Sequence, residues 1–127
     1  MINRFALLAL PLLAASTLPA VAAPSLLGSW KVASIDGAKP ISTKAEVTIE
    51  AKRIHATAGC NGLGGEYARG KGRLNTSPFM STMMYCEGLM DQEQAMARLL
   101  EAKPAYRFER GRLVLRGGGH RLVLVRG

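Results

Sequence analysis

The sequence predicts an α+β fold that is mainly antiparallel β-sheet, with about seven to eight short strands and one helix late in the chain. Three observations support this prediction. Short stretches of alternating apolar and polar residues recur between turn residues. One stretch, residues 91–103, consists of helix-forming residues in an amphipathic pattern. The connections between the predicted strands are short, which permits hairpins and excludes parallel crossovers.

The first three strands are predicted from alternation along the chain. Residues 28–35 form the first strand, which stops at the turn dipeptide Asp36-Gly37. Apolar side chains also alternate along residues 45–50 and again along residues 54–60. These two stretches predict the second and third strands, joined by a polar turn.

A glycine-rich stretch follows at residues 59–65. It predicts a bulge or a tight backbone crossing, because so many glycines are unusual in the interior of a strand. Residues 66–68 and 73–76 then predict a hairpin across the turn 69–72, and Pro78 ends that hairpin.

The helix is predicted to begin near Asp91 and to stop at Pro104. Residues 106–108, 113–115 and 122–125 predict three closing strands. One amphipathic helix cannot cover both faces of this many strands. The strands are therefore expected to cover one another by curling into a barrel or sandwich, with the helix filling the gap.

The N-terminal residues 1–22 predict a secretory signal peptide. Arg4 supplies the positive charge, residues 5–13 supply the apolar region, and Ala20 and Ala22 form an A-x-A site for cleavage after Ala22. Cleavage one residue later is the alternative site. An uncleaved membrane anchor is a further alternative, although the apolar run is shorter than the roughly 20 residues that a span needs.

Removal of residues 1–22 leaves one domain, residues 23–127, and takes away one cation, so the net charge falls from +8 to +7. Outside the cytoplasm we expect no nucleic-acid partner for this basic domain. The anionic neighbours there are lipopolysaccharide, phospholipid headgroups and acidic protein surfaces. A solvated basic exterior that only keeps the domain in solution is the favoured interpretation of this charge.

The two cysteines, Cys60 and Cys86, predict a single structural disulfide in an oxidising compartment. A redox-active pair is the alternative, but such pairs usually occur as C-x-x-C beside a helix N-terminus. No cysteine precedes Cys60, so the chain lacks the lipid-accepting cysteine of bacterial lipoproteins. We therefore expect a mature protein with neither a transmembrane nor a lipid anchor, in the periplasm or secreted.

No catalytic or metal-binding pattern is present in the sequence. His55 and His120 stand alone, without the neighbours that a zinc motif requires, and Glu66 has no acidic partner nearby in the sequence. Asp36 and Asp91 are explained by a turn and a helix start. We expect no enzyme activity, no metal and no cofactor.

Two further features could form contact surfaces. Met80, Met83 and Met84 are predicted to fill the core under the helix, and a soft apolar surface for a lipid tail or a protein partner is the alternative. Six arginines lie in the C-terminal hairpins, and simple solvation of their side chains is the favoured interpretation; a basic ridge for phosphate or carboxylate is the alternative. These arginines are residues 107, 110, 112, 116, 121 and 126.

The chain resembles the META domain family, which includes the HslJ-type heat-inducible envelope proteins. The resemblance rests on four blocks in order: Gly28-Ser29-Trp30 with its Asp36-Gly37 turn, residues 58–61 leading to 65–67, residues 81–86, and the helix at 93–100. It implies a small, partly open β-barrel with the helix packed in the opening. It also implies a role in the envelope or in stress tolerance, without established catalytic residues.

The resemblance adds support to the disulfide, because Cys60 and Cys86 stand at the two cysteine positions of the family. Two departures are present. Met83 stands where relatives commonly have a basic residue, and the lipid-accepting cysteine of many relatives is absent. A function that depends on membrane anchoring is therefore not expected here.

These features lead to one hypothesis and one alternative. The hypothesis is an exported, non-enzymatic, monomeric META-domain protein that binds an envelope component and helps to maintain the envelope under stress. The alternative is a secreted protein–protein module, such as an inhibitor or assembly chaperone for an exported partner. The candidate contact residues are Asn61, Met80, Met83 and Met84.

Overall fold

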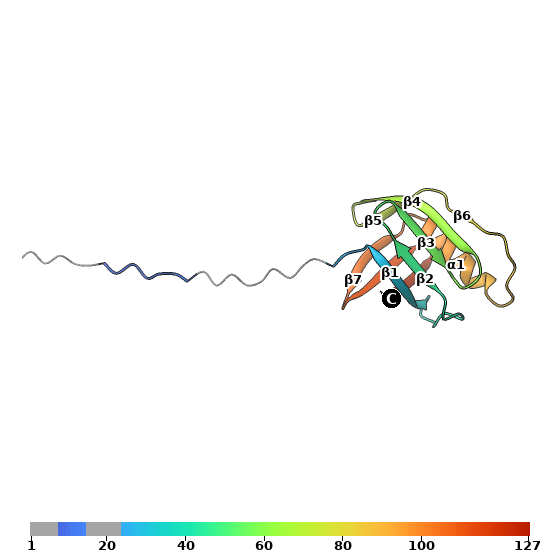
Figure 1. Ribbon diagram of the computed structural model, residues 1–127, viewed down its shortest axis with the longest axis horizontal. Helices are drawn as coiled ribbons and strands as arrows, with labels where there is room; N and C mark the ends of the chain where they lie inside the picture. The colour runs from blue at the N-terminus through green and yellow to red at the C-terminus, as the bar shows by residue number, and fades with distance from the viewer. Residues whose placement is uncertain (1–7, 15–23) are drawn as a thin grey trace, which may run out of the picture.

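The computed structural model describes residues 8–14 and 24–127 (Figure 1). The strands and the helix follow in this order: β1 (Gly28–Ile35), β2 (Glu46–Ile49), β3 (Arg53–Thr57), β4 (Gly62–Gly70), β5 (Arg73–Thr76), β6 (Met80–Ser81), α1 (Met90–Glu101), β7 (Ala105–Glu109), β8 (Arg112–Gly117) and β9 (His120–Arg126). The predicted mainly antiparallel β fold with a single late helix is confirmed.

Eight of these strands form a closed antiparallel barrel. Around the ring the order is β1, β2, β3, β4, β5, β7, β8 and β9, and β9 pairs again with β1. The short strand β6 pairs with β4 outside this ring. The barrel expected from the resemblance is therefore present, although it is closed rather than partly open. The shortest strand pairing in the ring is that of β5 with β7, in which one residue pair, Arg73 and Ala105, is in register.

The turn after β1 has the predicted conformation. Asp36 and Gly37 both have positive φ values, 51° and 84°, and Ile35 pairs with Ala38 across them. Two successive positive φ values are characteristic of a type I′ turn, for which Asp-Gly is a favoured sequence.

Part of the glycine-rich stretch, residues 62–65, belongs to a strand where the sequence predicted a bulge or crossing, whereas residues 59–61 form a bend before it. Residues 62–66 of β4 pair with β3 on one side, and Leu63 and Gly64 pair with β6 on the other. A Cβ on Gly65 would lie 2.3 Å from the Phe79 ring, so the ring occupies the place where a side chain would stand. The space that a side chain at Gly65 would occupy is therefore filled by Phe79, from the segment that precedes β6.

The barrel interior is filled by its own side chains. Trp30 of β1 is 2% exposed, and its indole N–H donates to the carbonyl of Leu26. The apolar residues that face inward from the strands form one buried cluster with Met96, Leu99 and Leu100 of α1. In Figure 1, α1 lies at the end of the barrel away from residues 24–27.

Helix α1 begins one residue before the predicted start and ends two residues before the predicted end. The chain leaves the helix at Ala102 and Lys103, and Lys103 has a left-handed φ of 52° just before Pro104. Within the described ranges, no helix has both the length and the apolarity to cross a membrane.

Most of the predicted signal peptide, residues 1–22, lies outside the described residues. The described part, residues 8–14, has no secondary structure and is exposed.

Candidate functional site

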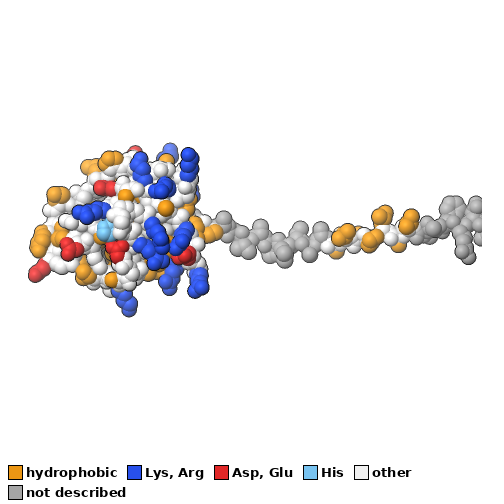
Figure 2. Space-filling view, turned by 180° about the vertical axis from the view of Figure 1, so that it is seen from behind, with side chains coloured by type: hydrophobic (Ala, Val, Ile, Leu, Met, Phe, Trp, Pro, Cys, Tyr) orange, Lys and Arg blue, Asp and Glu red, His pale blue; other side chains and the backbone are white. Residues whose placement is uncertain are grey.

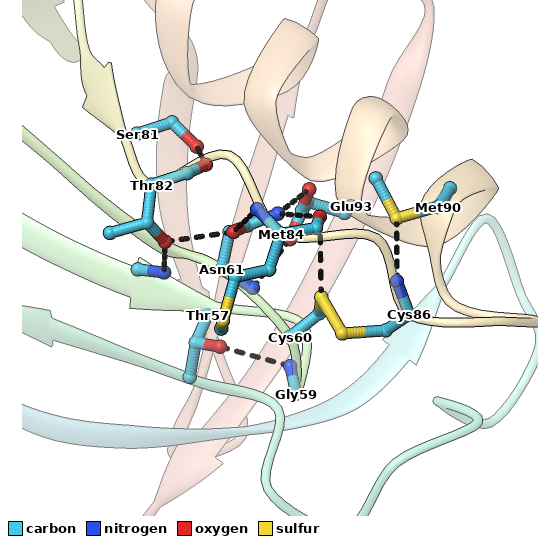
Figure 3. Close-up of a disulfide and its surroundings, with 11 residues drawn as sticks. Thr57, Gly59, Cys60, Asn61, Ser81, Thr82, Met84, Cys86, Met90 and Glu93 are labelled. Atoms are coloured by element: carbon cyan, nitrogen blue, oxygen red, sulfur yellow. Dashed lines mark hydrogen bonds between the residues drawn. A yellow bond between two sulfur atoms is a disulfide. The ribbon is translucent and has the colours of Figure 1, made fainter.

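The predicted disulfide between Cys60 and Cys86 is present (Figure 3). Cys60 lies between β3 and β4, and Cys86 lies four residues before α1. The Cα atoms of the two cysteines are 5.9 Å apart. The bond therefore joins the start of β4 to the segment that leads into the helix.

Asn61, the next residue, is buried and uses its whole hydrogen-bonding capacity (Figure 3). Its Nδ2 donates to Oε2 of Glu93 at 2.8 Å and to the carbonyl of Met84 at 2.9 Å. Its Oδ1 accepts from the hydroxyl of Thr82 at 2.8 Å and from the N–H of Met84 at 2.7 Å. We call Asn61, Thr82, Met84 and Glu93 the Asn61 network.

Glu93 is the member of this network that the sequence did not reveal. It is only 6% exposed, and its two carboxylate oxygens accept from the N–H and the Nδ2 of Asn61. Glu93 also lies in the first turn of α1, where the helix dipole favours a negative charge. The buried carboxylate is thus stabilised by two hydrogen bonds and by the end of the helix on which it lies.

We call residues 80–85 the Met segment. Its large side chains are exposed: Met83 is 95% exposed, Met80 82%, Tyr85 80% and Met84 56%. Core filling under the helix, the role that the sequence favoured for the methionines, is therefore wrong. Their chemistry remains that of an adaptable apolar surface.

The backbone of the Met segment is nevertheless fixed. The N–H of Thr82 donates to the carbonyl of Gly62 at 3.2 Å, and both backbone polar groups of Met84 bond to Asn61. The predicted contact set is therefore corrected at one position: Asn61, at 2% exposure, holds the Met segment from inside and is not part of the exposed surface.

Of the histidines and acidic residues considered for chemistry, the structure brings one pair together, His120 and Asp36. His120 Nδ1 lies 2.7 Å from Asp36 Oδ2, whereas His55 lies 3.9 Å from Glu50 on another part of the barrel. Among the described residues, no group of three His, Cys, Asp or Glu side chains could hold a metal ion. The hydrogen bond from His120, helped by the N–H of Arg121, lowers the pKa of Asp36 below its ordinary value of 3.8.

These observations define a small closed β-barrel with one helix, a disulfide and an exposed segment held by a buried asparagine. Residues 24–127 match the META domain, so the chain belongs to the META domain family. The family resemblance seen in the sequence is thereby confirmed. No curated protein is similar to the chain at a significant level.

Two solved structures share this fold. One NMR structure has a TM-score of 0.66 and 20% sequence identity, over 77% of this chain and 87% of that chain. The NMR structure of a protein from Burkholderia xenovorans has a TM-score of 0.62 and 20% identity, over 87% of this chain and 96% of that chain. At this level of identity, the similarity concerns the fold alone.

Proposed function

We propose that this META-domain protein is exported, is not an enzyme, and binds a protein component of the cell envelope through the Met segment. Its signal peptide is residues 1–22, and the mature chain begins at Ala23. The disulfide is compatible with an oxidising compartment. The family supports a role in the envelope or in stress tolerance.

The Met segment carries this proposal. Large apolar side chains are normally buried in the core, and those that stay exposed usually lie on mobile backbone. Here the backbone is held by the Asn61 network while Met80, Met83 and Tyr85 point into solvent. A fixed backbone lowers the entropy that binding would cost, and the flexible thioethers adapt to the shape of a partner.

A surface contact fits this barrel better than an enclosed ligand. The interior is occupied by buried side chains such as Leu74, Leu113 and Leu115, each at 0% exposure. An acyl chain would have to displace them, at a cost in stability that a small domain cannot bear. The partner is therefore expected to bind surface to surface, as a folded protein does.

Site-specific photocrosslinking in cells tests the proposal. A photoreactive amino acid at Met83 should give one adduct with an exported protein. The same probe at Lys71, exposed in the turn between β4 and β5, should not. Equal crosslinking from both positions, or adducts with cytoplasmic proteins, would contradict the proposal.

The envelope role has a genetic test. A strain that lacks the gene should become sensitive to heat or detergent, and the parent protein should restore growth. A variant with Met80, Met83 and Met84 changed to Gln should accumulate normally, because these side chains are exposed, but should fail to restore growth. Full restoration of growth by this variant would show that the exposed methionines of the Met segment are not needed for the function.

A further inference from the structure

The positive charge of the chain is concentrated near its C-terminus. Residues 103–127 contain seven Lys or Arg residues and one acidic residue, Glu109, in a chain whose net charge is +8. Figure 2, which views the molecule from the side opposite to Figure 1, shows Lys and Arg side chains gathered on one part of that face. Residues 103–127, which include strands β7, β8 and β9, therefore supply most of the net charge.

The strand register places four of these arginines on the outer face of β7, β8 and β9. Arg116 of β8 stands directly opposite Arg121 of β9. Arg112 of β8 stands opposite Glu109 of β7, and Arg107 lies two residues before Glu109 on the same face of β7. We call Arg107, Arg112, Arg116 and Arg121 the arginine face.

Two valines form an apolar floor beneath the arginine face. Val114 lies between Leu113 and Leu115, which point into the core, so its own side chain points outward. Val123 pairs with Val114 and has the same orientation. Although both point outward, Val114 is only 1% exposed and Val123 only 8%.

The arginine side chains account for this burial. Arg121 of β9 reaches Glu109 of β7 at 4.0 Å, and to do so it must cross β8, where Val114 lies between them. The alkyl part of arginine packs well on apolar surface while its guanidinium stays in water. The guanidinium groups are therefore held at the surface above a packed floor.

Charge compensation on this face is incomplete. Glu109 forms an ion pair with Arg107 at 2.9 Å and lies 4.0 Å from Arg121, but Arg112 and Arg116 form no ion pair among the described residues. Like charges directly opposite each other on neighbouring strands, as Arg116 and Arg121 are, destabilise a sheet. The fold thus keeps an unfavourable pair of like charges, Arg116 and Arg121, on neighbouring strands.

We propose that the arginine face docks the domain on an anionic lipid surface, with the guanidinium groups binding the phosphates of lipid headgroups. Guanidinium binds phosphate in a bidentate manner, and its charge does not depend on pH in the physiological range. The four arginines span three adjacent strands, roughly 5 Å apart, so they fit several neighbouring phosphates rather than one. Tyr85 is the only aromatic among the exposed large hydrophobic side chains of the described residues, so this face offers no stacking platform for bases.

This surface is separate from the Met segment. In the ring, β4, to which β6 is attached, lies four strands from β9 in either direction. Docking through the arginine face would therefore leave the Met segment directed away from the lipid. The inference does not depend on the proposed function, because each surface is tested with its own variants.

Vesicle co-sedimentation tests the inference. The protein, in the form in which cells accumulate it, should bind phosphatidylcholine vesicles that contain phosphatidylglycerol, but not vesicles of phosphatidylcholine alone. A variant with Arg112, Arg116 and Arg121 changed to Gln should bind on the order of a hundredfold more weakly, about fivefold for each arginine. Glutamine keeps part of the alkyl cover over the valines, and circular dichroism verifies the fold.

A matched control removes the same charge elsewhere. Lys39, Lys44 and Lys52 are exposed in the loops around β2, and changing all three to Gln should weaken binding much less. The single change Arg116→Gln removes the unfavourable pair with Arg121 and so should fold at least as well as the parent, yet bind about fivefold more weakly. This variant keeps the test decisive if the triple variant does not fold.

Three results would overturn the inference. The first is equal loss of vesicle binding in the arginine and lysine variants, which would indicate net charge alone. The second is tighter binding to a single-stranded oligonucleotide than to the anionic vesicles at the same salt concentration. The third is complete competition by millimolar inorganic phosphate, which would indicate a site for a free anion rather than a docking surface.

Discussion

Replacing Asn61 with alanine should lower the free energy of unfolding by about 4 kcal/mol. The change removes four side-chain hydrogen bonds, two of them to the backbone of Met84, one to Glu93 and one to Thr82. The bond to the buried carboxylate of Glu93 is worth about 2 kcal/mol, the bond to Thr82 about 1, and the two to Met84 about 0.5 each because water can replace them.

That loss is large for one small domain, whose total stability is typically about 5–15 kcal/mol. Urea unfolding followed by circular dichroism gives the difference directly, and the melting temperature should fall by roughly 20 °C. Asn75→Ala is the matched control, because Asn75 is exposed and its side chain has one partner among the described residues, the carbonyl of Gly70, 3.5 Å from Nδ2. It should change stability by less than about 0.5 kcal/mol.

The reasoning fails if Asn61→Ala and Asn75→Ala differ by less than about 1 kcal/mol. A double-mutant cycle adds a second check. Glu93→Gln alone should destabilise the domain, but Asn61→Ala should cost less in the Glu93→Gln background, since the carboxylate bond is already lost. Strict additivity of the two changes would show that Asn61 and Glu93 do not act as a pair.

Three further predictions concern other parts of the barrel. Gly65→Ala should destabilise the domain by about 1–3 kcal/mol, because the new Cβ meets the Phe79 ring, whereas Gly62→Ala has open space and should be nearly neutral. Replacing both cysteines with serine should cost about 3.5 kcal/mol in urea unfolding, as the chain-entropy model gives for a sequence separation of 26 residues. The pKa of Asp36 is lowered in the folded protein, so its carboxylate stabilises the fold at pH values above the ordinary pKa of 3.8. This stabilisation is lost as the pH falls through the lower pKa of the folded state. The difference in stability between the parent and Asp36→Asn should therefore shrink in acid.

Each of these has a contrary result. Equal effects of the two glycine changes would show that the Phe79 ring moves aside freely. An unchanged unfolding midpoint for the cysteine variant would mean that the disulfide does not constrain the unfolded chain. A constant difference between the parent and Asp36→Asn from neutral pH to pH 2 would mean that the hydrogen bond to His120 does not favour the charged carboxylate.

The elements whose signals are local were predicted well. Strand β1 matches its predicted bounds, because the alternation along residues 28–35 and the Asp36-Gly37 turn both act within a few residues. Helix α1 differs by one or two residues at its ends, which is the ordinary uncertainty of helix boundaries. The cysteine pair was also predictable, since only one pairing exists for two cysteines.

The features that depend on distant neighbours were not predictable in the same way. The strand at residues 62–65 is paired with β3 and covered at Gly65 by the Phe79 ring, and nothing in the glycine run itself reveals those neighbours. The burial of Asn61 depends on Glu93, 32 residues further along the chain. An isolated Asn beside a cysteine and an isolated Glu in a helix start each have a simpler local explanation, so their pairing required the fold.

The methionines illustrate the opposite case, in which composition indicates the chemistry but not the placement. Three methionines near a helix fit a core as well as a surface, because thioether side chains suit both. The Asn61 network decides between the two, because it fixes the backbone of Met84 at the edge of β4 and leaves Met83 outside.

Because β9 pairs with β1, the barrel can close only after residues 120–126 have been synthesised. β1 begins at Gly28 and must wait for residues 120–126 before its second edge is covered, so the core cannot be sealed until the final strand is available. Until then β1 and β8 both present open edges that can pair with other chains. A truncation that removes β9 should therefore yield an aggregating product rather than a smaller barrel.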